Sequence, residues 1–537
     1  MSRLPKLLEH RRGDTTPLEM FDEAVAVLGD GPLLIGPSGT LGATDVDRLV
    51  ASLAEALAGF GVQAGDRVAL HLQNDPQFVV GMLAAWRLGA IAVPCSPMLR
   101  GRELAVQLRD AGPVALIALD ELYRDVSEAV GDSVVRVVIT TGRDDLYDGV
   151  EIASTTVPSA GTHSFRELVR TACERALRPP PLPDDIAVLT YTSGTTGPAK
   201  GAMNTHANVA QAARIYRDCL QVGPDDVILG IAPLYHVTGL TAHIGLSLAT
   251  RAALILAHRF DAAECCRLIE RHRATVTVAA ITAYVAIANH EAARAHDLSS
   301  LRLAYSGGAP IAPATVRDIR SRTGLRIRPV YGLTETTGPT HLCPPDLDAP
   351  VHDQTGALAV GLAAPETEAR IVGEHGRPLP PGEVGEVAIR GRQVVGGYWM
   401  RPDETAHALP DGELLTGDVG LTDRHGWLYL VDRRKDLIIA SGFKVWPREV
   451  EDVLYEHDAV REAAVIGVPD SYRGETVWAY VSLQAGSEAS EAELITHCRD
   501  RLASYKYPRA VRILPELPKT HSGKILRRDL RKLAEAG

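Results

Sequence analysis

The stretch Leu189-Thr-Tyr-Thr-Ser-Gly-Thr-Thr-Gly-Pro-Ala-Lys-Gly201 decides how the rest of this 537-residue chain is interpreted. The apolar run 186–189 predicts a buried strand, and the loop after it holds four hydroxyl side chains, two glycines and Lys200. Glycines let backbone N–H groups approach a phosphate closely, hydroxyls add donors, and a lysine supplies positive charge. The spacing differs from a Walker A loop, in which GxxxxGK precedes Ser or Thr. The stretch therefore predicts a phosphate-binding loop of another kind, with a flexible connection as the alternative.

Outward from this loop, short apolar segments alternate with helical segments. The apolar segments are 68–72, 90–94, 114–119, 134–140, 227–231, 253–257 and 276–280. Such alternation predicts an α/β fold with largely parallel sheets. Near the N-terminus, a Pro-Ser-Gly turn within 32–42 predicts a hairpin, and Thr44 with an acid three residues later predicts the N-cap of the next helix.

The pattern changes after about Ala369, first to short strands joined by glycine turns and then, from Asp436, to a separate α+β pattern. In that last part we expect strands over 437–440, 463–468 and 477–483 and helices over 447–455 and 491–502. The charged run Asp432-Arg-Arg-Lys-Asp436 lies between the two patterns. We therefore expect two domains, 1–434 and 435–537; the alternative for the charged run is an ordinary surface turn.

Composition excludes several classes of protein. The chain has 56 Lys and Arg against 67 Asp and Glu, a net charge of −11, which argues against nucleic acid as a partner. The N-terminus lacks an apolar leader, and the longest apolar run, 274–289, is shorter than the roughly 20 residues of a membrane span. The seven cysteines show no CxxC spacing, so neither a disulfide scaffold nor a structural zinc site is expected. A cytoplasmic protein without a membrane span fits best.

Four further stretches carry a family resemblance together with 189–201. They are Ser306-Gly-Gly-Ala-Pro310, Tyr331-Gly-Leu-Thr-Glu-Thr336, Thr416-Gly-Asp418 with 432–436, and Pro518-Lys-Thr-His-Ser-Gly-Lys-Ile525. With these motifs in order, the chain resembles the adenylate-forming superfamily of acyl-CoA synthetases, luciferases and peptide-synthetase adenylation domains from about Asp14 to Arg531. The resemblance implies a large N-terminal domain of αβ-layered sheets plus a distorted β-barrel, and a small α+β C-terminal domain that rotates.

The resemblance implies a binding site for ATP and AMP. Residues 306–310 offer a wall without side chains for adenine, Tyr331 stacks on that ring, and Asp418 accepts hydrogen bonds from the ribose. Taken singly, these residues are also typical of turns or solvated surface positions. The full set of implied nucleotide-binding residues is Thr192, Ser193, Gly194, Thr195, Thr196, Gly197, Lys200, Gly308, Ala309, Pro310, Tyr331, Gly332, Thr334, Asp418, Arg433 and Lys524.

The catalytic residues implied by the resemblance are Lys524, Thr192, Glu335 and His236. Lys524 bridges the carboxylate being activated and the α-phosphate, where two anions must meet. Glu335 and Thr192 hold Mg²⁺, a hard cation that prefers oxygen ligands and substrate phosphates. The resemblance also places the domain hinge at Lys435 and the CoA channel at Gly442.

An acyl pocket is implied around Pro233-Leu-Tyr-His-Val-Thr-Gly239. Its expected residues are His236, Thr238, Gly239 and Gly307, although a packed core histidine is the equal alternative for His236. Ala280 and Ala283 leave room for a bulky or long acid if they face the cavity. Because these stretches carry no basic residue, we expect an apolar acid, whether fatty, aryl or polycyclic, rather than a diacid.

The expected function is an ATP-dependent carboxylic acid–CoA ligase. The acid and MgATP give acyl-AMP and pyrophosphate, and CoA then displaces AMP to form the thioester. The alternatives are an adenylating enzyme that loads a separate carrier protein, a luciferase-like oxidase, and a nucleotide-binding homologue without turnover. The expected partners are the acid, ATP and CoA, and a homodimer is left open.

Overall fold

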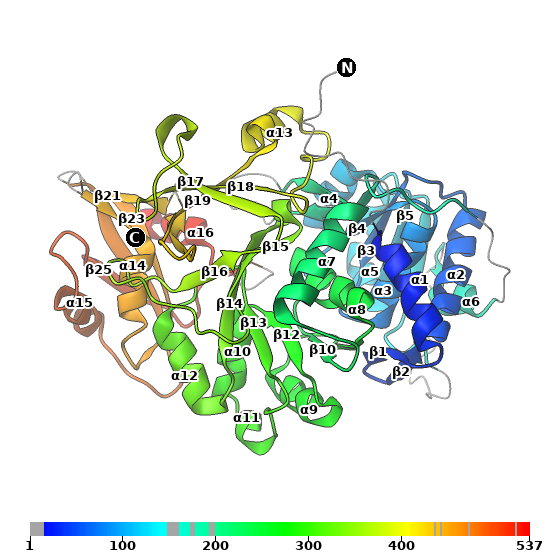
Figure 1. Ribbon diagram of the computed structural model, residues 1–537, viewed down its shortest axis with the longest axis horizontal. Coiled ribbons are helices and arrows are strands. Elements are labelled where there is room, and N and C mark those ends of the chain that lie inside the picture. The colour runs from blue at the N-terminus through cyan, green and yellow to red at the C-terminus, as the bar shows by residue number, and fades with distance from the viewer. Residues whose placement is uncertain are drawn as a thin grey trace.

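The computed structural model describes residues 15–147, 161–171, 178–192, 199–433, 436–440, 443–470, 473–520 and 524–536. Within them, three β-sheets form the framework. Figure 1 shows the last part of the chain, orange to red, at one end of the molecule and the blue N-terminal helices at the opposite end. The expectation of a mixed α/β fold with a small C-terminal α+β part is confirmed.

The first sheet has seven strands, which are parallel except for the last pair. Its order is β7 (His163–Ser164), β6 (Val137–Thr141), β5 (Ala115–Leu119), β3 (Arg67–His71), β4 (Ile91–Pro94), β8 (Ile186–Tyr191) and β9 (Gly201–Thr205). Strands β8 and β9 pair antiparallel, with Tyr191 opposite Gly201. The predicted phosphate loop therefore connects two neighbouring strands at one edge of this sheet.

The second sheet has thirteen strands and changes character at β14 (Ile327–Leu333). From β14 the parallel half continues through β13 (Leu303–Ser306), β12 (Val276–Ala279), β10 (Val227–Gly230), β11 (Ala253–Leu256) and β1 (Pro32–Gly36), and ends in the hairpin strand β2 (Gly39–Gly42). The antiparallel half runs through β15 (Gly338–Leu342), β16 (Ala359–Ala363), β20 (Leu428–Arg433), β19 (Leu414–Thr422), β18 (Gly385–Gly391) and β17 (Thr367–Val372). Register shifts interrupt several ladders of the antiparallel half. This half is the part of the chain for which a distorted β-barrel is expected.

Helices cover the two large sheets. They are α1 (Pro17–Leu28), α2 (Ala43–Gly59), α3 (Pro76–Arg87), α4 (Gly101–Ala111), α5 (Asp120–Gly131), α6 (Phe165–Arg170), α7 (His206–Leu220), α8 (Leu246–Thr250), α9 (Ala262–His272), α10 (Ile281–Asn289), α11 (Ala292–Ala295), α12 (Pro313–Thr323) and α13 (Pro402–Ala408). Short turns of other helix types are η2 (Gly239–Gly245), η3 (Thr334–Thr336), η4 (Glu374–Gly376) and η5 (Pro410–Gly412). The expected N-cap at Thr44 is wrong: α2 starts at Ala43, with Gly42 as its cap, because β2 runs directly into the helix.

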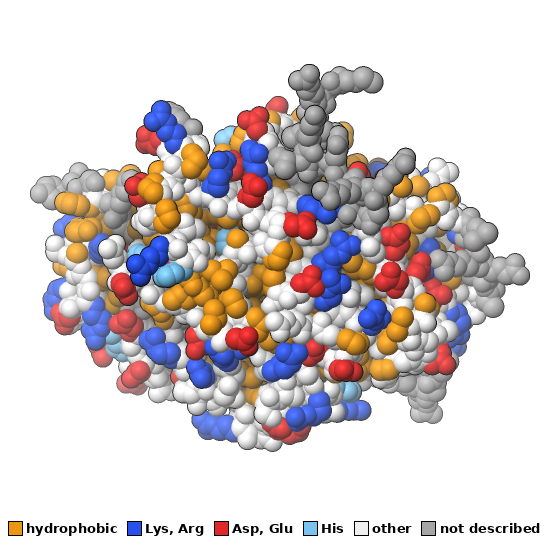
Figure 2. Space-filling view, in the orientation of Figure 1, with side chains coloured by type: hydrophobic (Ala, Val, Ile, Leu, Met, Phe, Trp, Pro, Cys, Tyr) orange, Lys and Arg blue, Asp and Glu red, His pale blue; other side chains and the backbone are white. Residues whose placement is uncertain are grey.

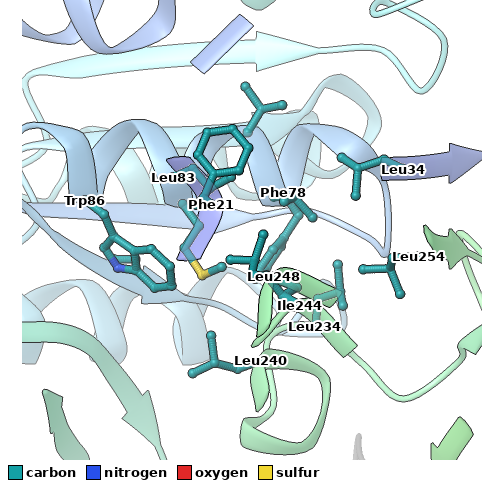
Figure 3. Close-up of a cluster of buried hydrophobic side chains, with 14 of the residues drawn as sticks. Phe21, Leu34, Phe78, Leu83, Trp86, Leu234, Leu240, Ile244, Leu248 and Leu254 are labelled. Carbon is teal, nitrogen blue, oxygen red and sulfur yellow. The ribbon is translucent and has the colours of Figure 1, made fainter. Parts of the chain in front are cut away.

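The main core lies where the two large sheets face the same helices. Every residue of α3 is buried, so this helix has no solvent-facing side. Figure 3 shows Phe78, Leu83 and Trp86 of α3 packed among side chains from α1, α8, η2, β1 and β11. Trp86 also donates from Nε1 to the Ala187 carbonyl on β8 at 2.9 Å. This packing fixes the strand that leads into the phosphate loop.

The C-terminal unit, residues 438–536, has its own five-stranded sheet and core. Its strands are β21 (Ile438–Ala440), β22 (Phe443–Val445), β23 (Val460–Asp470), β24 (Gly474–Leu483) and β25 (Ala510–Ile513), and its helices are α14 (Pro447–Leu454), α15 (Glu491–Arg499) and α16 (Arg527–Ala536). The strands and helices expected here from the sequence are confirmed, with ends that differ by a few residues. The expected boundary at 434/435 lies outside the described residues and stays a prediction.

Surface charge and helix length are relevant to the partners that the protein can bind. Figure 2 shows acidic and basic side chains interspersed over the visible face. Among the residues that the structure describes, no helix is long and apolar enough to cross a bilayer.

Candidate active site

A cavity of about 1530 Å³ lies between the large sheets and the C-terminal unit. It collects residues that are far apart in the sequence, from the end of β8 to the start of α16. The expected site residues among those lining it are Thr192, Lys200, His236, Gly308, Ala309, Pro310, Tyr331, Gly332, Thr334, Glu335, Asp418 and Lys524. The tertiary structure therefore brings most of the described part of the expected nucleotide site to one place.

Several expected residues lie outside the lining of this cavity or outside the described part of the chain. Ser193, Gly194, Thr195, Thr196 and Gly197 lie outside the described residues, and so do Lys435 and Gly442. The backbone of Arg433 is described, and it lies opposite Asp418 in the β19–β20 ladder. The roles expected for these residues stay predictions.

Two hydrogen bonds, donated by backbone N–H groups, join the ends of the phosphate loop. The Thr192 N–H donates to the Lys200 carbonyl at 3.0 Å, and the Lys200 N–H donates to Thr192 Oγ1 at 3.3 Å. The Lys200 ammonium lies 5.0 Å from the ring centroid of Tyr398, within reach of a cation–π interaction. The lysine thus packs against Tyr398 rather than extending into solvent.

Glu335 is held from two sides. Tyr398 donates its hydroxyl to Glu335 Oε1 at 2.7 Å, and the Val395 N–H donates to the Glu335 carbonyl at 2.9 Å. Burial, followed by the nearby Glu335 charge, raises the pKa of Tyr398, so the phenol stays protonated and remains a donor. Next to it, Asn204 Nδ2 donates to the Thr334 carbonyl at 3.3 Å and ties η3 to β9. The carboxylate therefore has a defined position at the cavity wall.

The donor set at this wall fits Mg²⁺. The Glu335 carboxylate, whose Oε1 accepts from Tyr398, and the Thr192 hydroxyl supply oxygen atoms at the same cavity. No group of three His, Cys, Asp or Glu that could hold a metal occurs among the described residues. Mg²⁺ commonly binds through one or two protein oxygens plus substrate phosphates, so a sparse oxygen set suits it.

Asp418 is almost fully buried, with 6% of its surface exposed, and its position is set by hydrogen bonds. Tyr331 donates its hydroxyl to Asp418 Oδ2 at 2.8 Å, and the Asp418 N–H donates to Thr416 Oγ1 at 3.1 Å. The Tyr331 ring also packs against His341, with centroids 5.9 Å apart. Tyr331 therefore orients the carboxylate expected to bind ribose, while its stacking on adenine stays a prediction.

Lys524 reaches the cavity from the C-terminal unit. A Cβ built on Gly308 would lie 3.4 Å from Lys524 Cε, and Gly308 has a φ of +81°, a conformation that favours glycine. The loop that carries the lysine is closed by Thr520, whose Oγ1 accepts from the Lys524 N–H at 3.0 Å. The lysine thus lies against the glycine-rich wall expected to face adenine.

His236 lies near Lys524 and is neutral at physiological pH. Burial, followed by the Lys524 charge, lowers the pKa of His236 to about 3. Its Nδ1 accepts from the Thr238 N–H at 3.2 Å, so in the neutral ring the proton is on Nε2. The histidine lines the cavity as a neutral group, which agrees with a site role better than with a fully enclosed core position.

The other expected acyl-pocket residues have a different setting. Thr238, Gly239 and Gly307 are not among the residues that line the cavity. Close backbone approaches account for both glycines: a Cβ on Gly239 would lie 2.2 Å from the Pro233 carbonyl oxygen, and one on Gly307 would lie 2.7 Å from that of Val330. On α10, the cavity is lined by Ile281, Thr282, Val285, Ala286 and Asn289, and not by Ala283. Contact of these residues with the acid stays a prediction.

Sequence reasoning missed the residues that hold the site residues in place. Tyr398 binds Glu335 and lies beneath Lys200, and Asn204 anchors η3. Arg448 lines the same cavity from α14. The one local signal at Tyr398 is the Gly396-Gly397 pair before it, which by itself indicates only a turn.

Fold and cleft together are those of adenylate-forming enzymes. An anthranilate CoA ligase solved with anthranoyl-AMP superposes with a TM-score of 0.88 at 27% identity, covering 97% of this chain and 98% of that one. A long-chain-fatty-acid–CoA ligase of Bacillus subtilis is 39% identical over 497 residues, 89% of this chain and 87% of the relative. A feruloyl-CoA synthase of Amycolatopsis is 36% identical over 492 residues, 91% of this chain and 93% of the relative.

Comparison with family models identifies the family of the chain. Residues 21–399 match the AMP-binding enzyme model, and residues 449–524 match its C-terminal domain model. The chain belongs to the AMP-binding enzyme family, and the expectation of an AMP-forming acid–thiol ligase of the acyl-CoA synthetase type is confirmed.

Proposed function

We propose that this ligase activates a long or bulky apolar acid in two half-reactions at the described cavity. The observation that carries the proposal is Lys524: a cation from the C-terminal unit lies at Gly308, in the cavity that also holds Glu335 and Asp418. A carboxylate is a poor electrophile, so activation requires it to attack the α-phosphate of ATP and expel pyrophosphate. Lys524 offsets the repulsion between those two anions and the charge that grows on the phosphoryl group.

The surrounding residues position the reactants in this proposal. Asp418, oriented by Tyr331, accepts from the ribose hydroxyls, and Lys200 with the phosphate loop binds the phosphates. His236, being neutral, adds an uncharged donor beside the acid carboxylate without competing with Lys524. Thr192 and Glu335 would hold Mg²⁺, which when bound neutralises phosphate charge.

We propose that the second half-reaction uses a different arrangement of the cavity, in which Lys524 has no role. We propose that the C-terminal unit rotates about Lys435, withdraws Lys524 and brings Gly442 to the site. The CoA thiolate then attacks the acyl carbonyl of acyl-AMP, the thioester forms, and AMP leaves with the bonding electrons. One cavity thus serves two reactions through domain movement.

The substrate class rests on the relatives and on the α10 side of the cavity. One relative is named for long-chain fatty acids and another for ferulate, an aryl acid. On α10 the lining is Ile281, Thr282, Val285 and Ala286 with Asn289, none of which carries a charge. We therefore propose fatty or aryl-substituted acids with a single carboxylate, with Mg²⁺ as the metal and the cytoplasm as the compartment.

The test is pyrophosphate release with MgATP over a panel of fatty, aryl and polycyclic acids, each with and without CoA. Acid-dependent release followed by thioester formation on adding CoA supports the proposal and names the substrate class. Release without a thioester would instead indicate that the acceptor is a carrier protein. Release with dicarboxylic acids only would contradict the proposed substrate class.

A further inference from the structure

Arg448 links the C-terminal unit to the wall of the nucleotide site. It lies at the start of α14, is 3% exposed, and faces the interface with the large sheets. Its Nη2 donates to the Ile311 carbonyl at 3.1 Å, and its Nη1 donates to the Leu430 carbonyl at 3.0 Å. Both acceptors belong to the N-terminal part of the chain, so both bonds cross the interface.

Both acceptor residues, Ile311 and Leu430, line the cavity. Ile311 follows directly after 308–310, the wall against which Lys524 lies, and Leu430 precedes Asp432 on β20. Asp432 accepts from the Arg448 N–H through Oδ2 at 3.0 Å and from Arg527 Nη1 through Oδ1 at 2.9 Å. One carboxylate of β20 therefore binds the first turns of both α14 and α16.

Arg448 and Arg527 both bond Asp432 across the interface but differ in their other partners. The remaining partners of Arg527 are Asp436 at 3.1 Å and Glu451 at 2.8 Å, and Glu451 lies on α14 within the C-terminal unit. Both hydrogen bonds of the Arg448 guanidinium end on carbonyl oxygens of the N-terminal part, while its Nε lies 3.5 Å from Asp452 Oδ2 within α14. Any large rotation of the C-terminal unit must therefore separate the Arg448 guanidinium from Ile311 and Leu430.

We propose that Arg448 is a positioning residue that holds the C-terminal unit where Lys524 meets Gly308, and so serves adenylation but not thioester formation. The inference rests on the proposed two-step function. Separating a buried guanidinium from its acceptors costs free energy, so the two interface bonds favour the arrangement with Lys524 in place. Removing them shifts the population away from that arrangement and leaves the chemistry of the second step untouched.

The experiment separates the two half-reactions in Arg448→Met. Pyrophosphate release in the presence of acid and MgATP measures the first, and thioester formation from prepared acyl-AMP and CoA measures the second. We expect the first to fall about tenfold or more and the second to stay within about twofold. Equal losses in both steps, which a merely structural role would produce, would overturn the proposal, and so would an unchanged first step.

A second variant and a control guard against misfolding. Arg448→Lys keeps the charge, but a single ammonium group cannot replace a guanidinium that donates to two carbonyls. We therefore expect an intermediate loss in the first step alone. Arg512→Met is the matched control, because Arg512 is exposed and bonds Glu491 within the C-terminal unit. It should change neither step.

A structural readout does not depend on activity. Asn289 Nδ2 donates to Gln484 Oε1 at 3.4 Å across the interface, and both side chains are near the surface. In an Asn289→Cys, Gln484→Cys background, a short bismaleimide, which adds to both thiols, should link residues 289 and 484 quickly, and Arg448→Met should slow this reaction. Unchanged cross-linking would count against the role of Arg448, whereas a wild-type chain that adenylates no acid would count against the proposed function alone.

Discussion

At the scale of single residues, Lys524 is the sharpest test of the proposed first step. Its Cε lies 3.4 Å from the position of a Gly308 Cβ, in a cavity that already holds Glu335 and Asp418. Replacing Lys524 with Ala should lower acyl-AMP formation at least about 100-fold, because a positioned charge is lost where negative charge develops. Thioester formation from prepared acyl-AMP should persist. Lys532→Ala, on the exposed face of α16, is the control, and a pyrophosphate assay that finds both variants equal would refute the role.

Tyr398 provides a second residue-scale prediction. Tyr398→Phe removes the hydroxyl that donates to Glu335 Oε1 at 2.7 Å but keeps the ring that lies beneath Lys200. We expect adenylation at limiting Mg²⁺ to fall about tenfold, because a hydrogen bond to a charged group is lost. Raising the Mg²⁺ concentration should restore part of the rate if Glu335 is a ligand. The measurement is the Mg²⁺ dependence of pyrophosphate release, and an unshifted dependence would contradict the proposed link.

At the scale of elements, the turn between β10 and η2 depends on one close approach. A Cβ on Gly239 would lie 2.2 Å from the Pro233 carbonyl oxygen and 2.6 Å from Leu234 Cα, so the backbone carrying His236 must move in Gly239→Ala. We expect this variant to lose about 1–3 kcal/mol of stability, the usual cost of overpacking, and to adenylate slowly. Thermal unfolding measures the first effect. Gly59→Ala, where no atom lies within 4 Å of the added Cβ, should not be destabilised.

At the scale of the whole molecule, buried histidines make stability depend on pH. Burial lowers the pKa of His71 and His243 to about 4 and that of His206 and His341 to about 3. Below pH 6.5 the unfolded chain therefore binds more protons than the folded chain. The contribution of these histidines to stability is fully present above that pH and decreases as the pH falls toward 4. Between pH 7 and 5.5 we expect each histidine to remove about 1 kcal/mol.

Denaturant unfolding at the two pH values measures this loss. His206→Phe keeps a ring against Trp86, whose centroid lies 5.4 Å away, and should reduce the difference between the two pH values by about 1 kcal/mol. Wild-type stability that does not change over this range would contradict the assignment of neutral buried histidines.

The amino-acid sequence by itself determined the elements and the chemistry. Alternation of apolar segments predicted the parallel strands, and in the C-terminal unit β21, β23, β24, α14 and α15 follow the expected ranges. Hydrophobic periodicity is a local property, which is why it can be recognised without the fold. The ordered motifs around Lys200, Tyr331, Asp418 and Lys524 likewise indicated adenylate-forming chemistry before any geometry was known.

Only the tertiary structure decided how those motifs meet and what holds them. The bonds from Tyr398 to Glu335, from Tyr331 to Asp418 and from Arg448 to Ile311 join residues that have no fixed spacing in sequence. Gly239 and Gly307 do not line the cavity. The structure shows instead that each is needed because another backbone segment lies too close for a side chain. Motif residues reflect what the reaction needs, whereas their supports depend on which side chains the packing of separate sheets brings within about 3 Å, the reach of a hydrogen bond.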